Sequence, residues 1–171
     1  GLAGLFHDIG KVRLPPEVLN KQENFTAEDF EVLRNYPYHS VNAFLRTKRL
    51  NESVLLRLVV AFEHNMESNG YPVIERKRRT HLFSRIVAIA DGFDAMTTER
   101  PWRNGHLPDE CLKLMLKDSG TRYDPVLLKV FVNVMGLYPL GTFVVLDTGE
   151  KAIVYHNNAE PRFFNRPLVK V

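Results

Sequence analysis

Residues 7–11 of this chain read HDIGK, and residues 82–96 read LFSRIVAIADGFDAM. The second segment is apolar on nearly every side, which is typical of a central helix packed against several neighbours. It carries Asp91 at a position where burying an unpaired carboxylate would cost several kcal/mol of free energy. The Asp91 carboxylate therefore requires a partner, which can be a metal ion, a cation or a helix cap. A carboxylate satisfied by nearby backbone or by an arginine is the alternative. Residues 82–96 therefore predict a central helix in which Asp91 has a partner.

The chemistry of these residue types points to a metal site. An imidazole beside a carboxylate offers one nitrogen ligand and one oxygen ligand, and a carboxylate can bridge two cations. Asp91 adds a second carboxylate from another helix. Such a site suits phosphodiester hydrolysis, because metal ions polarise phosphoryl oxygens and lower the pKa of a bound water. We therefore expect a metal-dependent phosphohydrolase in which metal-activated water attacks phosphorus.

Composition narrows the class of protein. The chain has 171 residues, of which 44% are hydrophobic, so it can bury a core as one domain or one domain with a small appendage. Cys111 is the only cysteine, which excludes an internal disulfide. No apolar run reaches about 18 residues, and no signal-peptide pattern opens the chain. We expect a cytoplasmic protein whose segment makes no membrane contact. The net charge of +3 is modest, and we expect no DNA or RNA polymer as partner.

Signals for helix starts recur as far as Gly136. Thr26 with Asp29 forms a capping-box pattern, and we expect a helix of about 20 residues from Thr26. Asn51 is a suitable N-cap for the next helix. Residues 108–119 and 124–135 have the pattern of two further amphipathic helices. An apolar stretch is already in progress at the first residue, so we expect a fragment that begins inside a helix.

The pattern changes after Gly136. Residues 142–146 and 152–155 are rich in β-branched and aromatic side chains, and a turn-like DTGE segment separates them. Residues 166–171 are a candidate third strand. We expect a helical domain over residues 1–136 and a small, incomplete β appendage over residues 137–171.

Four motifs occur in order: HDIGK at residues 7–11, GYP at 70–72, DGFDAMTT at 91–98 and RPWR at 100–103. In this combination the sequence resembles the HD-GYP family, bacterial phosphodiesterases of the HD superfamily that hydrolyse cyclic di-GMP. The resemblance covers about residues 1–135. It implies an all-α HD-type bundle, a di- or trinuclear site, usually of iron or manganese, and the products pGpG or GMP. For this chain we expect one or two divalent ions, iron or manganese.

The resemblance also assigns roles to individual residues. The metal ligands it implies are His7, Asp8, His64 and Asp91, with Asp8 as the bridging, catalytic carboxylate. Lys11 matches a catalytic lysine beside the site, where its ammonium could touch a phosphate or the leaving oxygen. The residues implied for substrate binding are Tyr71, Arg100 and Arg103.

Two ligand positions depart from the family pattern. Tyr36 stands where the family usually has histidine, and a phenol with a pKa near 10 is a poor metal ligand at neutral pH. Asn65 replaces the second of two adjacent histidines, and its carbonyl oxygen is a weaker ligand than imidazole. His39 and Asn65 are the alternative ligands. The departures keep open a degenerate module that binds cyclic di-GMP or a signalling protein, such as a diguanylate cyclase, without efficient hydrolysis. A homodimer and an HD hydrolase of another nucleotide also stay open.

Overall fold

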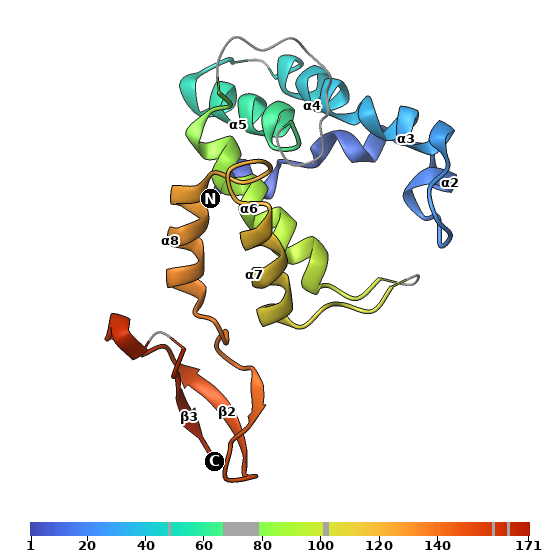
Figure 1. Ribbon diagram of the computed structural model, residues 1–171. Coiled ribbons are helices and arrows are strands. Elements are labelled where there is room, and N and C mark those ends of the chain that lie inside the picture. Colours follow the sequence, from blue (N-terminus) through green and yellow to red (C-terminus); the bar gives the residue numbers. More distant parts are fainter. Residues whose placement is uncertain (48, 67–78, 101–102, 159, 164) are drawn as a thin grey trace.

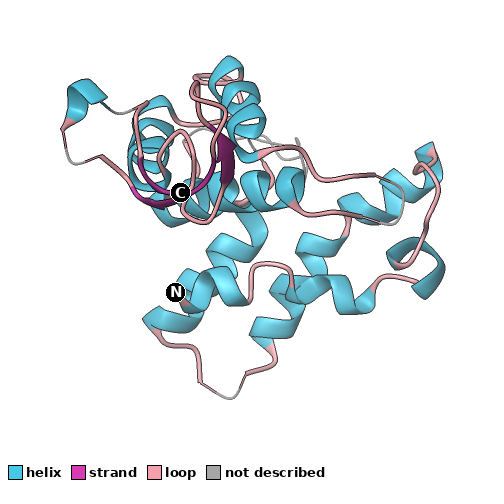
Figure 2. Cartoon of the chain, turned by 90° about the horizontal axis from the view of Figure 1, so that it is seen from below, coloured by secondary structure: helices cyan, strands magenta, loops and turns pink. Residues whose placement is uncertain are grey.

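The computed structural model describes residues 1–47, 49–66, 79–100, 103–158, 160–163 and 165–171. Helices form a bundle, and the strands of the described residues lie in the C-terminal part of the chain (Figure 2). The helices and 3-10 turns are α1 Leu2–Leu5, η1 Ile9–Arg13, α2 Pro16–Leu19, α3 Ala27–Arg34, α4 Tyr36–Leu45, α5 Glu52–Glu63, α6 Leu82–Thr97, α7 Pro108–Lys117, α8 Pro125–Met135 and η2 Pro161–Phe163. The strands are β1 Phe143–Val145, β2 Lys151–His156 and β3 Leu168–Lys170. The expected all-α bundle with a small C-terminal sheet is confirmed.

The sheet follows α8 and lies at one end of the bundle (Figure 1). Its strand order is β1-β2-β3 with both pairs antiparallel. Phe143 pairs with Ile153, which in turn pairs with Lys170. The expected hairpin and third strand are therefore confirmed.

Helix α6 is central, as its apolar sequence predicts, and contacts α5, α7 and α8. Its Ile89 joins a buried cluster with side chains of α7 and α8, including Leu112 and Leu128. A second cluster between α4 and α5 contains Phe44, Val54 and Ala61. Burial of each large apolar side chain contributes about 1.5–3 kcal/mol, so these two clusters fix the helices on either side of the site.

The predicted caps are present where the side chains can reach main-chain amides. Thr26 and Asp29 form the reciprocal capping box of α3, and the Asn51 side chain accepts from the amide of Val54. Asp124 accepts from two amides of α8 and also pairs with Arg85 of α6 at 2.6 Å. This last carboxylate therefore caps one helix and ties it to another.

The expected long helix from Thr26 is wrong, because α3 ends at Arg34 and α4 begins at Tyr36. Pro37 has no amide hydrogen, and its ring would clash with a carbonyl one turn earlier, so the α3 helix cannot continue through it. The break falls at Asn35, between the two helices. It leaves Tyr36 at the start of α4, where the side chain is 0% exposed.

The 3-10 turn η1 lies very close to α4. The amide of Gly10 donates to Ser40 Oγ at 2.9 Å. A Cβ added to Gly10 would lie 2.2 Å from the backbone oxygen of Tyr36. Only glycine allows this approach, which places residues 7–11 beside α4.

We predict that Gly10→Ala lowers the free energy of unfolding by about 2–3 kcal/mol, because the added methyl group meets backbone rather than a movable side chain. Gly4→Ala is the matched control, since its Cβ would lie 4.0 Å from Val87. It should change stability by less than about 1 kcal/mol. Urea unfolding followed by circular dichroism measures both, and equal stability of the two variants would contradict the close packing.

Candidate metal centre

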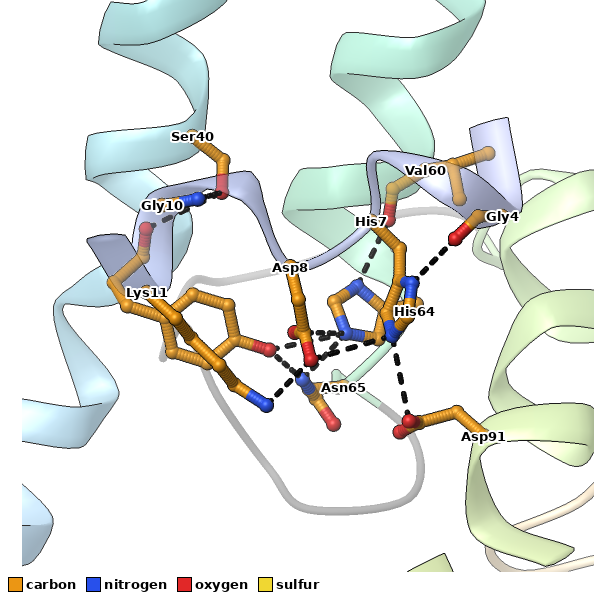
Figure 3. Close-up of polar contacts among 11 residues, drawn as sticks. Gly4, His7, Asp8, Gly10, Lys11, Ser40, Val60, His64, Asn65 and Asp91 are labelled. Atoms are coloured by element: carbon orange, nitrogen blue, oxygen red, sulfur yellow. Dashed lines mark hydrogen bonds and ion pairs between the residues drawn. The ribbon is translucent and has the colours of Figure 1, made fainter. Parts of the chain in front are cut away.

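Three separate parts of the chain bring polar side chains to one place (Figure 3). His7 and Asp8 lie in the turn before η1, His64 follows α5, and Asp91 lies in α6. His7 Nε2 is 3.3 Å from both Asp8 Oδ2 and Asp91 Oδ1. His64 Nε2 is 3.6 Å from Asp8 Oδ1. One ligand atom from each of His7, His64 and Asp91 lies within 4.8 Å of the others.

Main-chain carbonyls orient both imidazole rings. His7 Nδ1 lies 2.6 Å from the oxygen of Gly4, and His64 Nδ1 lies 3.0 Å from the oxygen of Val60. A carbonyl oxygen can only accept, so each Nδ1 carries the hydrogen and donates it. Each Nε2 is therefore the nitrogen turned toward the carboxylates, as in metal sites where the second ring nitrogen is held by an outer partner.

The charges of the cluster are strongly coupled. Burial alone would lower the pKa of His7, but its hydrogen bonds with Asp8 and Asp91 outweigh burial and raise that pKa to about 10. Burial alone would raise the pKa of Asp8, but the adjacent His64 and His7 rings and the charge of Lys11 hold that pKa well below its usual range. Two carboxylates thus converge on a point that requires positive charge.

This donor set fits a divalent cation. Asp8 Oδ1 is buried and has no hydrogen-bond partner among the residues that the structure describes, which leaves a strong acceptor oxygen facing the cluster. Imidazole nitrogens with carboxylate oxygens are ligands that suit iron, manganese and zinc. The residues that would hold one ion are His7, Asp8, His64 and Asp91.

The two departures from the family pattern lie together on one side of the cluster. Tyr36 Oη is 3.0 Å from His64 Nε2, and Asn65 Nδ2 is 2.7 Å from the same nitrogen. Asn65 also donates to the Tyr36 oxygen. A neutral phenol and an amide NH2 are hydrogen-bond donors here, so they compete with a cation for His64 Nε2.

Lys11 belongs to the same cluster. Its Nζ lies 2.5 Å from Asp8 Oδ2 and 5.2 Å from the centre of the Tyr36 ring. The ammonium is therefore held beside Asp8, where it offsets part of the carboxylate charge.

The other candidate residues lie apart from this cluster. His39 lines a different cavity, with Arg13, Asn42 and Arg46, and the structure does not bring it to the four ligands. Arg103 donates to the backbone oxygen of Ala95 at 2.5 Å, one turn beyond Asp91 on α6, and its backbone pairs with that of Arg100. Tyr71 and the rest of the GYP motif lie outside the described residues.

One residue of the site escaped the sequence analysis. The Glu63 carboxylate accepts from the amide of His81 at 2.6 Å and from Ser84 Oγ at 3.0 Å. It fastens the end of α5 to the start of α6, and so holds His64 in place relative to Asp91. An acidic residue directly before a ligand histidine was the available signal.

Fold and cluster together define a helical domain of the HD type. A sequence model described as HD domain matches residues 1–127, and the chain belongs to this family. None of the helices in the described part of the chain is long and apolar enough to span a membrane.

Proteins with similar sequences are named as phosphodiesterases of cyclic dinucleotides. A cyclic di-GMP phosphodiesterase of Pseudomonas aeruginosa is 30% identical to this chain. The match covers the whole of this chain and 40% of the length of the Pseudomonas protein. Another from Thermotoga maritima is 32% identical over 77% of the chain and 36% of its own length. The 3'3'-cGAMP-specific phosphodiesterase 1 of Vibrio cholerae is 30% identical over 77% of the chain and 30% of its own length. The predicted HD-GYP membership is confirmed, and the chain spans less than half the length of these relatives.

We predict that Asp91→Ala weakens Mn²⁺ binding by at least about tenfold, because it removes a carboxylate from the converging set. Asp94→Ala is the matched control, since this exposed residue lies on the same helix outside the cluster. Titration with Mn²⁺, followed by elemental analysis of the desalted protein, measures both. Equal affinity in the two variants would show that Asp91 is not a ligand.

Proposed function

We propose that this chain is the hydrolytic domain of a cyclic di-GMP phosphodiesterase, which opens the cyclic dinucleotide to pGpG and GMP. The observation that carries the proposal is the convergence of two imidazoles and two carboxylates from three parts of the chain. The names of the relatives support cyclic di-GMP as the substrate. A bound iron or manganese ion would supply Lewis acidity to the phosphodiester and lower the pKa of water.

The residues of the chain would prepare the site for an anionic substrate. His7 and His64 present Nε2 because their Nδ1 atoms are held by carbonyls, and Asp8 and Asp91 supply negative charge. Lys11 places a positive charge beside Asp8, close enough to meet a phosphoryl oxygen. Arg100 and Arg103 add two more cations near α6, which favour a ligand with two phosphates.

A second function is favoured by a specific contact. The hydrogen bonds of Tyr36 and Asn65 with His64 use the side of the cluster where the family carries further histidines. Two-metal sites stabilise both the attacking and the leaving oxygen, so a single ion gives slower hydrolysis. The alternative is a module that binds cyclic di-GMP and acts through a partner such as a diguanylate cyclase.

The first test is hydrolysis itself. The chain, loaded with Fe²⁺ or Mn²⁺ without oxygen, should convert cyclic di-GMP to pGpG and GMP, as followed by chromatography. Asp8→Ala should reduce the rate at least about a hundredfold, because it removes a ligand whose oxygen is buried in the cluster. Product formation that persists in Asp8→Ala would refute a role for this site, and no product from metal-loaded parent protein would favour the binding module.

The effect of Tyr36 and Asn65 on the site can be tested by restoring the histidines of the family pattern. We predict that Tyr36→His combined with Asn65→His raises the bound metal from one ion to two per chain and increases the hydrolysis rate at least about tenfold. The matched control is Tyr38→His, which introduces the same residue at an exposed position of α4. Unchanged metal content in the double variant would mean that Tyr36 and Asn65 do not limit the site.

A further inference from the structure

A cleft of about 340 Å³ opens beside Asp91, between α6, α7 and the turn that precedes α8. Asp91 belongs to both this cleft and the ligand cluster, so a molecule held at the cluster can extend directly into the cleft. Its volume is in the range of small-molecule sites. The lining side chains on which the argument rests are Met96, Leu114, Met115, Lys117, Asp118 and Tyr123.

The walls of the cleft are mainly apolar. Met115 and Tyr123 are 1% and 5% exposed, and Tyr123 packs directly on α6. A Cβ at Gly92 would lie 2.5 Å from the Tyr123 hydroxyl, so glycine is what allows this contact. Leu114, at 41% exposed, stands at the rim. Apolar walls of this kind suit the faces of an aromatic ring such as a nucleobase.

The polar side chains of the cleft have a defined pattern. Asp118 forms an ion pair with Arg122 at 3.2 Å, whereas Lys117 forms none with any carboxylate in the part of the chain that the structure describes. The Lys117 ammonium and the Asp118 carboxylate therefore belong to adjacent residues that both line the cleft. Guanine presents acceptors at O6 and N7 and donors at N1 and N2, which match a cation and a carboxylate. Adenine presents an amino donor in place of O6, which a lysine cannot satisfy.

We propose that this cleft binds one guanine base of the cyclic dinucleotide, and that Lys117 and Asp118 select guanine over adenine. The proposal rests on the proposed function, because it names the base-binding part of that same site. Lys117 donates to the O6 and N7 edge, Asp118 accepts from N1 and N2, and Met96 with Leu114 covers the ring.

The occupancy of the cleft is tested by filling it. Leu114→Trp should raise the KM for cyclic di-GMP, relative to the KM for bis(p-nitrophenyl) phosphate, which has no base, at least about tenfold. Leu116→Trp is the matched control, since Leu116 is 47% exposed on the same helix and does not line the cleft. An unchanged KM for cyclic di-GMP in Leu114→Trp would overturn the proposal.

Selectivity is tested at Lys117. Lys117→Ala should reduce the preference for cyclic di-GMP over cyclic di-AMP at least about tenfold, whereas Lys113→Ala, an exposed lysine paired with Asp109, should not. An unchanged preference in Lys117→Ala would overturn the assignment of this residue.

The experiments distinguish failure of the proposed hydrolytic function from failure of the proposed guanine site. If the parent binds cyclic di-GMP in calorimetry but does not hydrolyse it, the same variants are compared by affinity. Loss of affinity in Leu114→Trp alone then supports the cleft while the hydrolytic function fails. A parent that neither binds nor hydrolyses cyclic di-GMP overturns both.

Discussion

The architecture depends on the contacts of two imidazoles, His64 buried and His7 partly buried, with two carboxylates. His7 Nε2 lies at equal distance from Asp8 and Asp91, and His64 approaches Asp8 from the other side. These groups come from the turn before η1, the end of α5 and the middle of α6, so satisfying their charges requires the three segments to meet. The two apolar clusters supply most of the burial energy, and the polar groups decide how the helices are placed around the site.

The same electrostatic requirement gives Tyr36 and Asn65 their importance. Both side chains are buried and both contact His64, so they are built into the site. A hydrogen-bond donor satisfies an imidazole nitrogen without adding positive charge, whereas a metal ion adds two. Under the proposed function, the balance between these two ways of satisfying His64 would decide between a working hydrolase and a binding module.

Prediction from sequence succeeded where the physical cause is local. The capping box at Thr26, the N-cap at Asn51 and the apolar surface of α6 depend on residues within a turn or two of each other. The long helix from Thr26 failed because the effect of Pro37 outweighed the helical spacing around it. Glu63 could not be assigned, because its partners are an amide and a hydroxyl of a helix that follows much later in the chain.

The orientation of the ligand rings also lies beyond residue patterns, because it comes from the main-chain oxygens of Gly4 and Val60. Every residue type carries such an oxygen, so these contacts persist through substitutions of the residues that provide them. Evolutionary drift at these two positions can therefore alter packing while the rings stay aimed at the same point. The orientation of the two imidazoles is buffered against mutation in this way, because it depends on backbone atoms that a side-chain substitution does not remove.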